Sequence, residues 1–540
     1  MSETIIIGGG HNGLVTAFYL AKAGRKPLVL ERRHVVGGCA TTEDFAPGYR
    51  SATLAHTLGP IRPSIVRDMQ LERRGVTFVH PDPRLVSVAP DGRALIFSTN
   101  AARTAEAIKP FSSKDAAKYP EFCATLGRIG GFLSELLEMT PPSIDAPSAA
   151  ALWELLKTGR RFRSLGKRES FALLRWGPMA VADLVAEWFE SDLLQASVAA
   201  RAIHGTAMGP WSAGTGAVLL LAAAIDPVPG GSSISAVGGP GAVTRAMADA
   251  AREAGAVIKT GADVHHIIVK DGAVSGVALA DGTEIAASMV VSGADPRRTF
   301  LDLIDPVELE PDFMTRIRNY RCPGTVAKLN FALTALPAFT GITGDPTAML
   351  RGRVHVGPGI DYLERAFDAS KYGETSTSPY LDVTFPSIAD PSMAPAGRHV
   401  MSVHMQYAPF KRRSGTWDAQ EHTLADIALR TLGSYAPGIT SLVEYRQVIT
   451  PLDLERVYGL TGGHIHHGEL ALDQLFTMRP TLGWAEYRTP IDGLYLCGSG
   501  THPGNGLTGG SGQNAAKAIL KARPRTTPAG ARPIASVHDK

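Results

Sequence analysis

Three glycines with a fixed spacing stand near the start of the chain, between an apolar run and a helical pattern. Gly8, Gly10 and Gly13 follow the run 4–7, and Glu31 ends the next apolar run, about twenty residues further on. Glycine allows a tight turn and a close backbone approach to a pyrophosphate, and the N-terminus of the following helix attracts anions. A carboxylate after the second strand can accept hydrogen bonds from ribose hydroxyls. The pattern predicts a strand–helix–strand unit that binds a dinucleotide.

A second glycine-rich segment lies at the far end of the chain, at 494–520. It contains a predicted short strand (494–497), a glycine turn and a helical pattern over 512–520. A nicotinamide-binding unit is normally complete within one run of strand–helix repeats, whereas contacts from both ends of a chain suit a larger cofactor. We therefore predict FAD. Besides the four residues above, its predicted contacts are Arg32, Gly37, Gly38, Val264, Gly498, Gly500, Gly504, Leu507 and Thr508.

Between these two ends, residues 230–296 have the pattern of a helix followed by short strands. An alanine-rich amphipathic helix ends near Gly255. Asp-Gly pairs at 271–272 and 281–282 are typical of hairpin turns. A helix, an antiparallel meander and a return strand indicate the middle part of a flavin-binding domain. The predicted strands are 257–259, 265–270, 273–279, 284–287 and 289–291.

These segments resemble the phytoene desaturase-like group of FAD-dependent oxidoreductases over nearly the whole chain. Within that group the chain is most similar to the pyridine nucleotide-disulphide oxidoreductase domain-containing proteins. The motifs that carry the resemblance are H-N-G-L-V (11–15), L-E-R-R-H-V-V-G-G (30–38), L-T-G-G-H-I-H-H-G (460–468) and C-G-S-G-T-H-P-G-N-G-L-T-G-G (497–510). The sequence departs from the family pattern at Asn505, where these proteins often have glycine or alanine.

The resemblance implies an α/β fold of the amine oxidase and phytoene desaturase type. A Rossmann-like FAD-binding domain is expected from three discontinuous segments, 1–100, 230–300 and 485–523. A substrate domain with a mixed sheet and helices is expected from 101–229 and 301–484, since 101–229 has helical periodicity and 301–484 contains several strand-like runs. Residues 524–540 are rich in proline and polar residues, which predicts a disordered tail.

The resemblance also implies a reaction. A small apolar substrate of isoprenoid or lipid type would lose a hydride to flavin N5 and gain a double bond, and a quinone or oxygen would then accept the electrons. No motif identifies a catalytic base. Histidine is the usual acid–base residue near neutral pH, so His56, His464, His466 and His467 are the candidates.

Two alternative functions remain at this stage. A flavin amine or amino-acid oxidase has the same cofactor motifs, and it would need an aromatic cage or an arginine clamp such as Arg321 or Arg488. A flavin-binding regulatory protein with little turnover would also keep the cofactor motifs. Function depends on the site rather than the fold, so the motifs do not choose between these classes.

The histidine-rich loop at 464–467 has a spacing that could bind a metal ion. The only nearby acidic partner is Glu469, and a triplet without a second ligand cluster is weak evidence for a metal. We therefore predict no metal site and place the loop at the substrate cavity. For His502, inside the terminal glycine turn, we expect a structural role or a position near the pyrophosphate rather than catalysis.

Composition limits the remaining classes. A net charge of +3 on 540 residues does not predict nucleic-acid binding, and four widely spaced cysteines without a C-x-x-C motif argue against redox-active disulfide chemistry. Cys39 and Cys497 lie beside the flavin segments, where small buried residues are favoured over a covalent flavin link. The first strand begins at residue 4, which predicts a cytoplasmic protein without a targeting segment. The longest apolar run, 217–225, is too short to cross a bilayer.

A basic segment at 157–175 has no counterpart in the cofactor motifs. It contains seven cationic residues, one acid (Glu169) and interleaved apolar residues. Such a segment is typical either of a solvated helix face or of a peripheral contact with an anionic membrane. An oligomer interface is a third interpretation.

Overall fold

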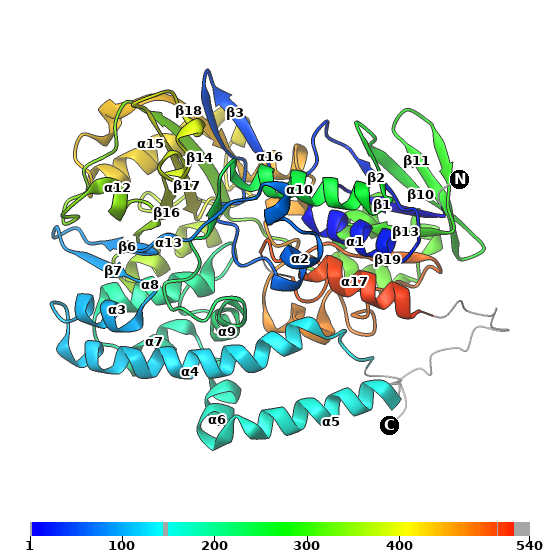
Figure 1. Ribbon diagram of the computed structural model, residues 1–540, viewed down its shortest axis with the longest axis horizontal. Helices are drawn as coiled ribbons and strands as arrows, with labels where there is room; N and C mark the ends of the chain where they lie inside the picture. Colours follow the sequence, from blue (N-terminus) through cyan, green and yellow to red (C-terminus); the bar gives the residue numbers. More distant parts are fainter. Residues whose placement is uncertain (1–2, 144–148, 505, 523–540) are drawn as a thin grey trace.

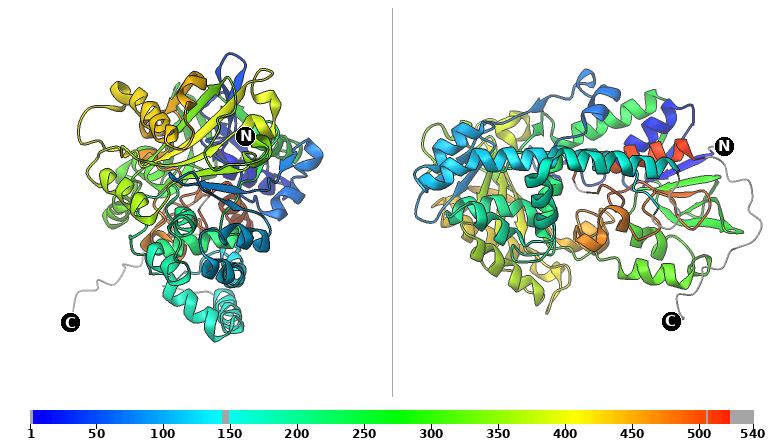
Figure 2. Two further views of the ribbon diagram at one scale, coloured as in Figure 1. Left: turned by 90° about the vertical axis from the view of Figure 1, so that its left-hand side faces the viewer. Right: turned by 90° about the horizontal axis from the view of Figure 1, so that it is seen from below.

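The computed structural model describes residues 3–143, 149–504 and 506–522. The predicted tail at 524–540 and Asn505 lie outside these residues. Figure 1 shows two lobes, one built around strand β1 and helix α1, the other around strands β14, β16 and β17. The chain passes between the lobes several times, and the long helix α4 (Ser113–Glu138) runs along both of them (Figure 2).

The first lobe is built on a five-stranded parallel sheet in the order β19-β13-β1-β2-β9. Its strands come from the three predicted segments of the chain, which confirms the discontinuous dinucleotide fold. Both faces of the sheet are covered at its centre, so β1 and β13 are mainly apolar and buried, whereas the edge strand β9 is largely exposed. The strands are β1 (Thr4–Ile7), β2 (Leu28–Glu31), β9 (Val257–Thr260), β13 (Met289–Ser292) and β19 (Leu494–Leu496).

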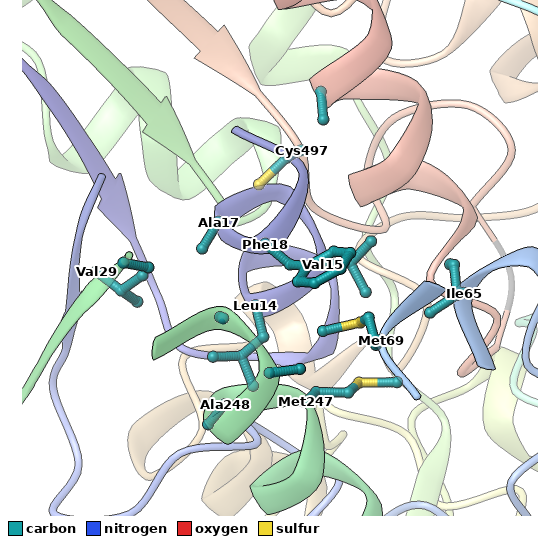
Figure 3. Close-up of a cluster of buried hydrophobic side chains, with 14 of the residues drawn as sticks. Leu14, Val15, Ala17, Phe18, Val29, Ile65, Met69, Met247, Ala248 and Cys497 are labelled. Atoms are coloured by element: carbon teal, nitrogen blue, oxygen red, sulfur yellow. The ribbon is translucent and has the colours of Figure 1, made fainter. Parts of the chain in front are cut away.

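Helices cover one face of this sheet, and an antiparallel meander covers the other. Ile6 and Val29 pack into the helical side, whereas Ile5 and Leu30 pack toward the meander. Figure 3 shows Leu14, Val15, Ala17 and Phe18 of α1 in the buried cluster, which also includes Met247 and Ala248 of α10. The helices are α1 (His11–Lys22), α2 (Pro63–Asp68), α10 (Gly239–Glu253) and α17 (Gly510–Lys521); the meander strands are β10 (Val264–Lys270), β11 (Ala273–Leu279) and β12 (Glu284–Ala286).

The second lobe contains a seven-stranded mixed sheet in the order β18-β14-β17-β16-β15-β6-β7. The sheet is mixed because β15 and β6 run parallel while the other neighbours are antiparallel. Its strands are β6 (Leu85–Val88), β7 (Ala94–Phe97), β14 (Val326–Leu333), β15 (Arg353–Val356), β16 (Tyr380–Thr384), β17 (His399–Gln406) and β18 (Val443–Ile449). The first flavin segment, expected to reach residue 100, therefore ends before Leu85, because the hairpin β6–β7 pairs with β15.

Most of the remaining helices belong to the second lobe, except α11, whose Phe313, Met314 and Ile317 pack in the first lobe beside Ile5 and Leu30. Helix α15 packs on the seven-stranded sheet, and α4, α7, α8 and α9 share a separate apolar core. The predicted helical insertion at 101–229 contributes most of the remaining helices. They are α3 (Ala101–Ile108), α4, α5 (Ala149–Ser164), α6 (Gly166–Trp176), α7 (Val181–Trp188), α8 (Asp192–Ile203), α9 (Thr215–Ile225), α11 (Pro311–Asn319), α12 (Pro346–Met349), α13 (Ile360–Lys371), α14 (Pro386–Ala389), α15 (Trp417–Gly433) and α16 (Pro451–Arg456). Short strand pairs join the lobes: β3 (Thr42–Ala46) with β4 (Tyr49–Ala52), and β5 (Phe78–Val79) with β8 (Ser235–Ala236).

No helix in the described ranges combines the length and apolar character needed to cross a bilayer.

Candidate active site

One cavity extends from the ends of strands β1 and β2 to the face of the seven-stranded sheet. It is lined by both ends of the chain and by both lobes, as the FAD hypothesis requires. Eleven of the thirteen predicted cofactor contacts line it: Gly8, Gly10, Gly13, Glu31, Arg32, Gly37, Gly38, Val264, Gly498, Leu507 and Thr508. The cavity therefore connects the dinucleotide-binding elements directly to the substrate lobe.

The first three glycines have different roles. A Cβ atom added to Gly8 or Gly10 would meet no atom within 4 Å, so both positions face open space in the cavity. Gly8 also has a φ of +92°, which disfavours other residues. At Gly13 a Cβ atom would lie 2.2 Å from the carbonyl oxygen of Gly8. Gly10 thus leaves room for a ligand, and Gly13 lets helix α1 approach strand β1.

Glu31 is held in a fixed orientation at the end of β2. Its Oε2 atom accepts a hydrogen bond from the Gly9 amide at 2.7 Å, and its Oε1 atom accepts one from the Arg33 amide at 2.8 Å. An ionised carboxylate has about four acceptor positions, so capacity remains for ribose hydroxyls. The location and geometry of this buried side chain fit the role predicted for it.

Gly500 and Gly504 do not line the cavity. A Cβ atom at Gly500 would lie 2.3 Å from Pro296 Cδ, and one at Gly504 would lie 2.8 Å from Arg479 Nε. Their small size is required by packing against neighbouring loops, and their role as cofactor contacts stays a prediction.

Arg479 was not identified from the sequence, although it organises this region. Its guanidinium is fully buried and donates to backbone carbonyls, including those of His466 at 2.7 Å, Ser499 at 2.8 Å and Glu469 at 2.9 Å. A buried arginine is tolerated because its donors are satisfied. Arg479 thereby fixes the histidine-rich loop against the C-terminal glycine turn.

The predicted histidines divide into two groups. His56, His466 and His467 line the cavity, but His464 does not. His464 is fully buried, with its Nε2 atom 3.7 Å from Glu469 Oε2. Burial lowers the pKa of His467 to about 4, so its ring is neutral at physiological pH. The site at His464 is therefore a buried histidine–carboxylate contact behind the cavity wall.

A row of polar side chains crosses the substrate sheet beside His56. Strand pairing places Lys328 of β14 opposite His404 of β17, His404 opposite Asp382 of β16, and Asp382 opposite His355 of β15. These four side chains are at most 1% exposed. Sequence patterns alone did not predict this row. The available signal was a charged residue or histidine inside each strand that is otherwise largely apolar, at positions that the strand register brings into line.

His56 contacts this row from the first lobe. Its Nδ1 atom lies 2.6 Å from Lys328 Nζ, and its Nε2 atom lies 3.7 Å from Asp382 Oδ1. Within the described residues, His56 Nε2 and Asp382 Oδ1 are buried without a hydrogen-bond partner. Both residues line the cavity. Burying polar atoms without hydrogen bonds costs free energy. The two atoms are therefore suited to bind a polar group of a substrate or a water molecule.

Burial and charge determine the protonation of this group. Burial lowers the pKa of Lys328 to about 7, with partial opposition from Asp382. Burial, followed by the charge of Lys328, lowers the pKa of His56 to about 3. Burial alone would raise the pKa of Asp382, but the Arg353 guanidinium and nearby histidines hold it well below its usual range. Asp382 is therefore ionised and His56 neutral at physiological pH, while Lys328 exchanges its proton near neutrality.

Helices α8 and α9 contribute an apolar patch to the cavity lining. It includes Val218, Ala222 and Ile225 of helix α9, together with Ala200 of α8 and Leu470. The same helical region also contributes Ser197, Arg201 and Asp226, so the cavity combines an apolar patch, mainly on α9, with polar groups from α8 and from the sheet. This arrangement accommodates a molecule with a hydrocarbon body and one polar group.

The arginines considered as a substrate clamp are outside the cavity lining. Arg321 forms an ion pair with Asp473 near the surface, at 2.7 Å, and Arg488 is exposed. The lining contains Arg201 and Arg353 instead. Arg201 donates to backbone carbonyls, including that of Val228 at 2.7 Å. These guanidinium groups already have protein partners, which reduces their availability to a substrate carboxylate.

Cys39 and Cys497 remain thiols in this environment. Burial raises the pKa of each to about 12. A thioether link to flavin would need a thiolate, so the structure disfavours it. Cys39 lines the cavity, whereas Cys497 packs in the core beside helix α1 (Figure 3).

Similarity to known proteins agrees with this geometry. A family described as "Flavin containing amine oxidoreductase" matches residues 13–520. The chain is 35% identical to pyridine nucleotide-disulfide oxidoreductase domain-containing protein 2 of Rattus norvegicus, over 96% of this chain and 93% of that protein. It is 28% identical to a subunit of limonene dehydrogenase from Castellaniella defragrans, over 96% of this chain and 94% of that protein. Phytoene desaturases are relatives at lower identity.

A solved structure of putrescine oxidase bound to putrescine has the same fold. It matches with a TM-score of 0.60 and 15% identity, over 96% of this chain and 99% of that chain. At this identity the likeness concerns the fold and not the substrate.

Proposed function

The chain belongs to the family of flavin-containing amine oxidoreductases and is an FAD-dependent oxidoreductase, and we propose that it dehydrogenates an apolar substrate of isoprenoid or lipid type. The observation that carries this proposal is the cavity in which an apolar patch, mainly on helix α9, adjoins polar groups and which is continuous with the dinucleotide elements. The relationship to limonene dehydrogenase and to phytoene desaturases supports a hydrocarbon-rich substrate.

The residues present fit the cofactor. Gly8 and Gly10 leave space for a phosphate group, Glu31 has free acceptor capacity, and segments from both ends of the chain meet at the cavity. When bound, FAD supplies the acceptor for a hydride from the substrate. The protein supplies the binding surface, the orientation of the substrate and a place for the proton that is lost.

We assign proton acceptance to His56, because it is the cavity-lining histidine with a partner that titrates near neutrality. When Lys328 is protonated, it donates to Nδ1, and the ring proton of His56 resides on Nε2. When Lys328 is neutral, its amine can accept from Nδ1–H, which leaves Nε2 free to accept a proton. Lys328 does not line the cavity and is a positioning residue. Asp382 faces the same Nε2 atom and stabilises the imidazolium that results.

The substrate's polar group is expected beside His56 and Asp382, with its hydrocarbon body against helix α9. An amine oxidation would release ammonia or an amine, whereas the proposed dehydrogenation leaves the carbon and nitrogen content of the substrate unchanged. We expect mass spectrometry of the reaction product to show a loss of two hydrogen atoms and no loss of nitrogen. A product formed by cleavage of a carbon–nitrogen bond would overturn the proposal in favour of an amine oxidase.

A further inference from the structure

The helical pair α5–α6 forms an arm beneath helix α4 (Figure 1) and exposes apolar side chains. Of the 18 large hydrophobic residues exposed in the described parts of the chain, six lie on this pair. A soluble protein rarely concentrates exposed apolar residues in this way unless the surface contacts a partner. The six are Leu152, Trp153, Leu155, Leu156, Phe171 and Leu174.

Cations without acidic partners lie beside these apolar side chains. Arg160, Arg163 and Lys167 have no carboxylate within ion-pair distance in the part of the chain that the structure describes. Their neighbours Arg161 and Arg168 differ, because each pairs with a glutamate of α4. The arm therefore carries free positive charge in addition to exposed hydrocarbon.

The apolar and basic residues share helix faces. On α5, Leu156, Arg160 and Arg163 follow the i, i+4, i+7 spacing of one face. On α6, the Nζ atom of Lys167 lies 6.0 Å from the ring centroid of Phe171, which is 63% exposed. An interfacial helix has this composition: aromatic and leucine side chains enter the acyl boundary, while arginine and lysine meet the headgroups.

We propose that the α5–α6 arm docks the protein on the surface of an anionic lipid bilayer. The positive charge of the arm favours a bilayer over a second copy of the chain as its partner. A two-fold contact between two arms would bring Arg160, Arg163 and Lys167 close to their own copies, whereas anionic headgroups neutralise them. This inference is independent of the substrate proposed above.

The arm can be altered without touching the site. No residue of 149–176 that the structure describes lines the active-site cavity. Contact with the body includes Phe162, whose ring centroid lies 5.9 Å from that of Phe132 on α4, and this residue is left unchanged in the test. Substitutions at exposed tips of the arm should therefore preserve the fold and the bound flavin.

Co-sedimentation with vesicles tests the proposal. The full-length holoprotein is mixed with vesicles of phosphatidylcholine and phosphatidylglycerol at a ratio of three to one, or of phosphatidylcholine alone. We expect binding to the anionic vesicles that falls at least tenfold on neutral vesicles, and at least tenfold between 0.1 M and 0.5 M salt, because the interaction is screened. Equal binding to both kinds of vesicle, or none, would overturn the proposal.

Two variants identify the surface. Leu156→Glu with Phe171→Glu removes apolar contacts, and Arg160→Glu with Arg163→Glu and Lys167→Glu reverses the free charge. Each is expected to reduce binding at least tenfold at an unchanged flavin content. The control is Val307→Glu, at a residue that is 81% exposed away from the arm, and it should bind like the wild type. If the arm variants instead dissociate a dimer seen by light scattering and leave vesicle binding unchanged, the surface is a self-association site and the bilayer proposal is wrong.

Discussion

The Nδ1 atom of His56 lies 2.6 Å from Nζ of Lys328, although the two residues are 272 positions apart in the chain. His56 follows the β3–β4 pair, and Lys328 lies on the second strand of the substrate sheet. The contact therefore joins the segment next to the dinucleotide unit to the polar row on β14, β17, β16 and β15. It places a neutral imidazole with a titratable partner at the boundary of the cofactor and substrate regions.

We predict that His56→Gln slows flavin reduction by substrate by about 10²- to 10⁴-fold, the usual contribution of a general base. The cause is loss of the proton acceptor, so FAD content should not change. Stopped-flow absorbance of the anaerobic protein measures the rate. The matched control is His422→Gln, at a side chain that is 71% exposed on α15. An unchanged rate in His56→Gln would exclude this role.

The lowered pKa of Lys328 leads us to expect a characteristic pH dependence of the rate of flavin reduction. Because the neutral amine frees His56 Nε2, the rate of flavin reduction should rise with pH through about 7. Lys328→Met should remove this rise, and the exposed Lys259→Met should keep it. A pH profile of the rate constant in the three proteins makes the comparison. Retention of the same rise in Lys328→Met would show that another group causes it.

Lys328 should also make the free energy of unfolding depend on pH, and the direction of that dependence follows from its pKa. Burial lowers the pKa of Lys328 to about 7 in the folded protein, whereas the ordinary value of 10.5 applies to the unfolded chain. Between these values the unfolded chain binds a proton that the folded protein does not. The free energy of unfolding therefore gains up to about 1.4 kcal/mol per pH unit from this group as pH rises. We expect the free energies of unfolding of wild type and Lys328→Met, measured in urea at pH 7 to 10, to diverge as pH rises. Parallel plots of this free energy against pH would contradict the lowered pKa of Lys328.

Gly10 and Gly13 should respond differently to substitution. Gly10 has a φ of −69° and open space at Cβ, so Gly10→Val should fold but lose bound FAD. Gly13→Ala places a methyl group against the Gly8 carbonyl and should destabilise even the apoprotein, by about 1–3 kcal/mol. Flavin absorbance and urea unfolding separate the two effects. Gly131→Val, at an open helical position, is the control. A full flavin content in Gly10→Val would contradict the proposed cofactor site.

Arg479 is expected to be structural and indispensable. Arg479→Met leaves several buried carbonyls without a donor, including those of His466, Ser499 and Glu469, which should cost more than about 3 kcal/mol. Since these carbonyls belong to both cavity-lining loops, FAD affinity should fall as well. Thermal unfolding with and without added FAD measures both effects. The exposed Arg488→Met should behave like the wild type, and equal melting temperatures for all three proteins would refute this role.

The sequence predicted the dinucleotide unit well because its signals are local. Glycine spacing, apolar runs and a terminal acid each act within a few residues, and the structure confirms the elements around Gly8, Gly10 and Glu31. The hairpin β6–β7 was assigned to the wrong lobe, because two short apolar strands with a turn do not reveal which sheet they join. That choice depends on pairing with β15, far along the chain.

The row of polar side chains on the substrate sheet could not be predicted from local sequence patterns, because it too depends on strand pairing. Lys328, Asp382 and His404 lie on three different strands far apart in the chain, and only the register of the strand pairs brings them together. His464 shows the opposite case. Its motif suggested a role in the cavity, but His464 is fully buried beside Glu469 and does not line the cavity. Spacing along the chain did not distinguish it from His466 and His467.

The most direct test is the visible spectrum of the purified holoprotein during anaerobic titration with isoprenoid alkenes and alcohols, with long-chain lipids and with amines. The account predicts that the oxidised flavin band, near ~450 nm, is bleached by a member of the isoprenoid or lipid class and is unaffected by amines. Bleaching by amines alone would contradict the proposed dehydrogenation, and a protein that cannot bind FAD would contradict the cofactor site itself.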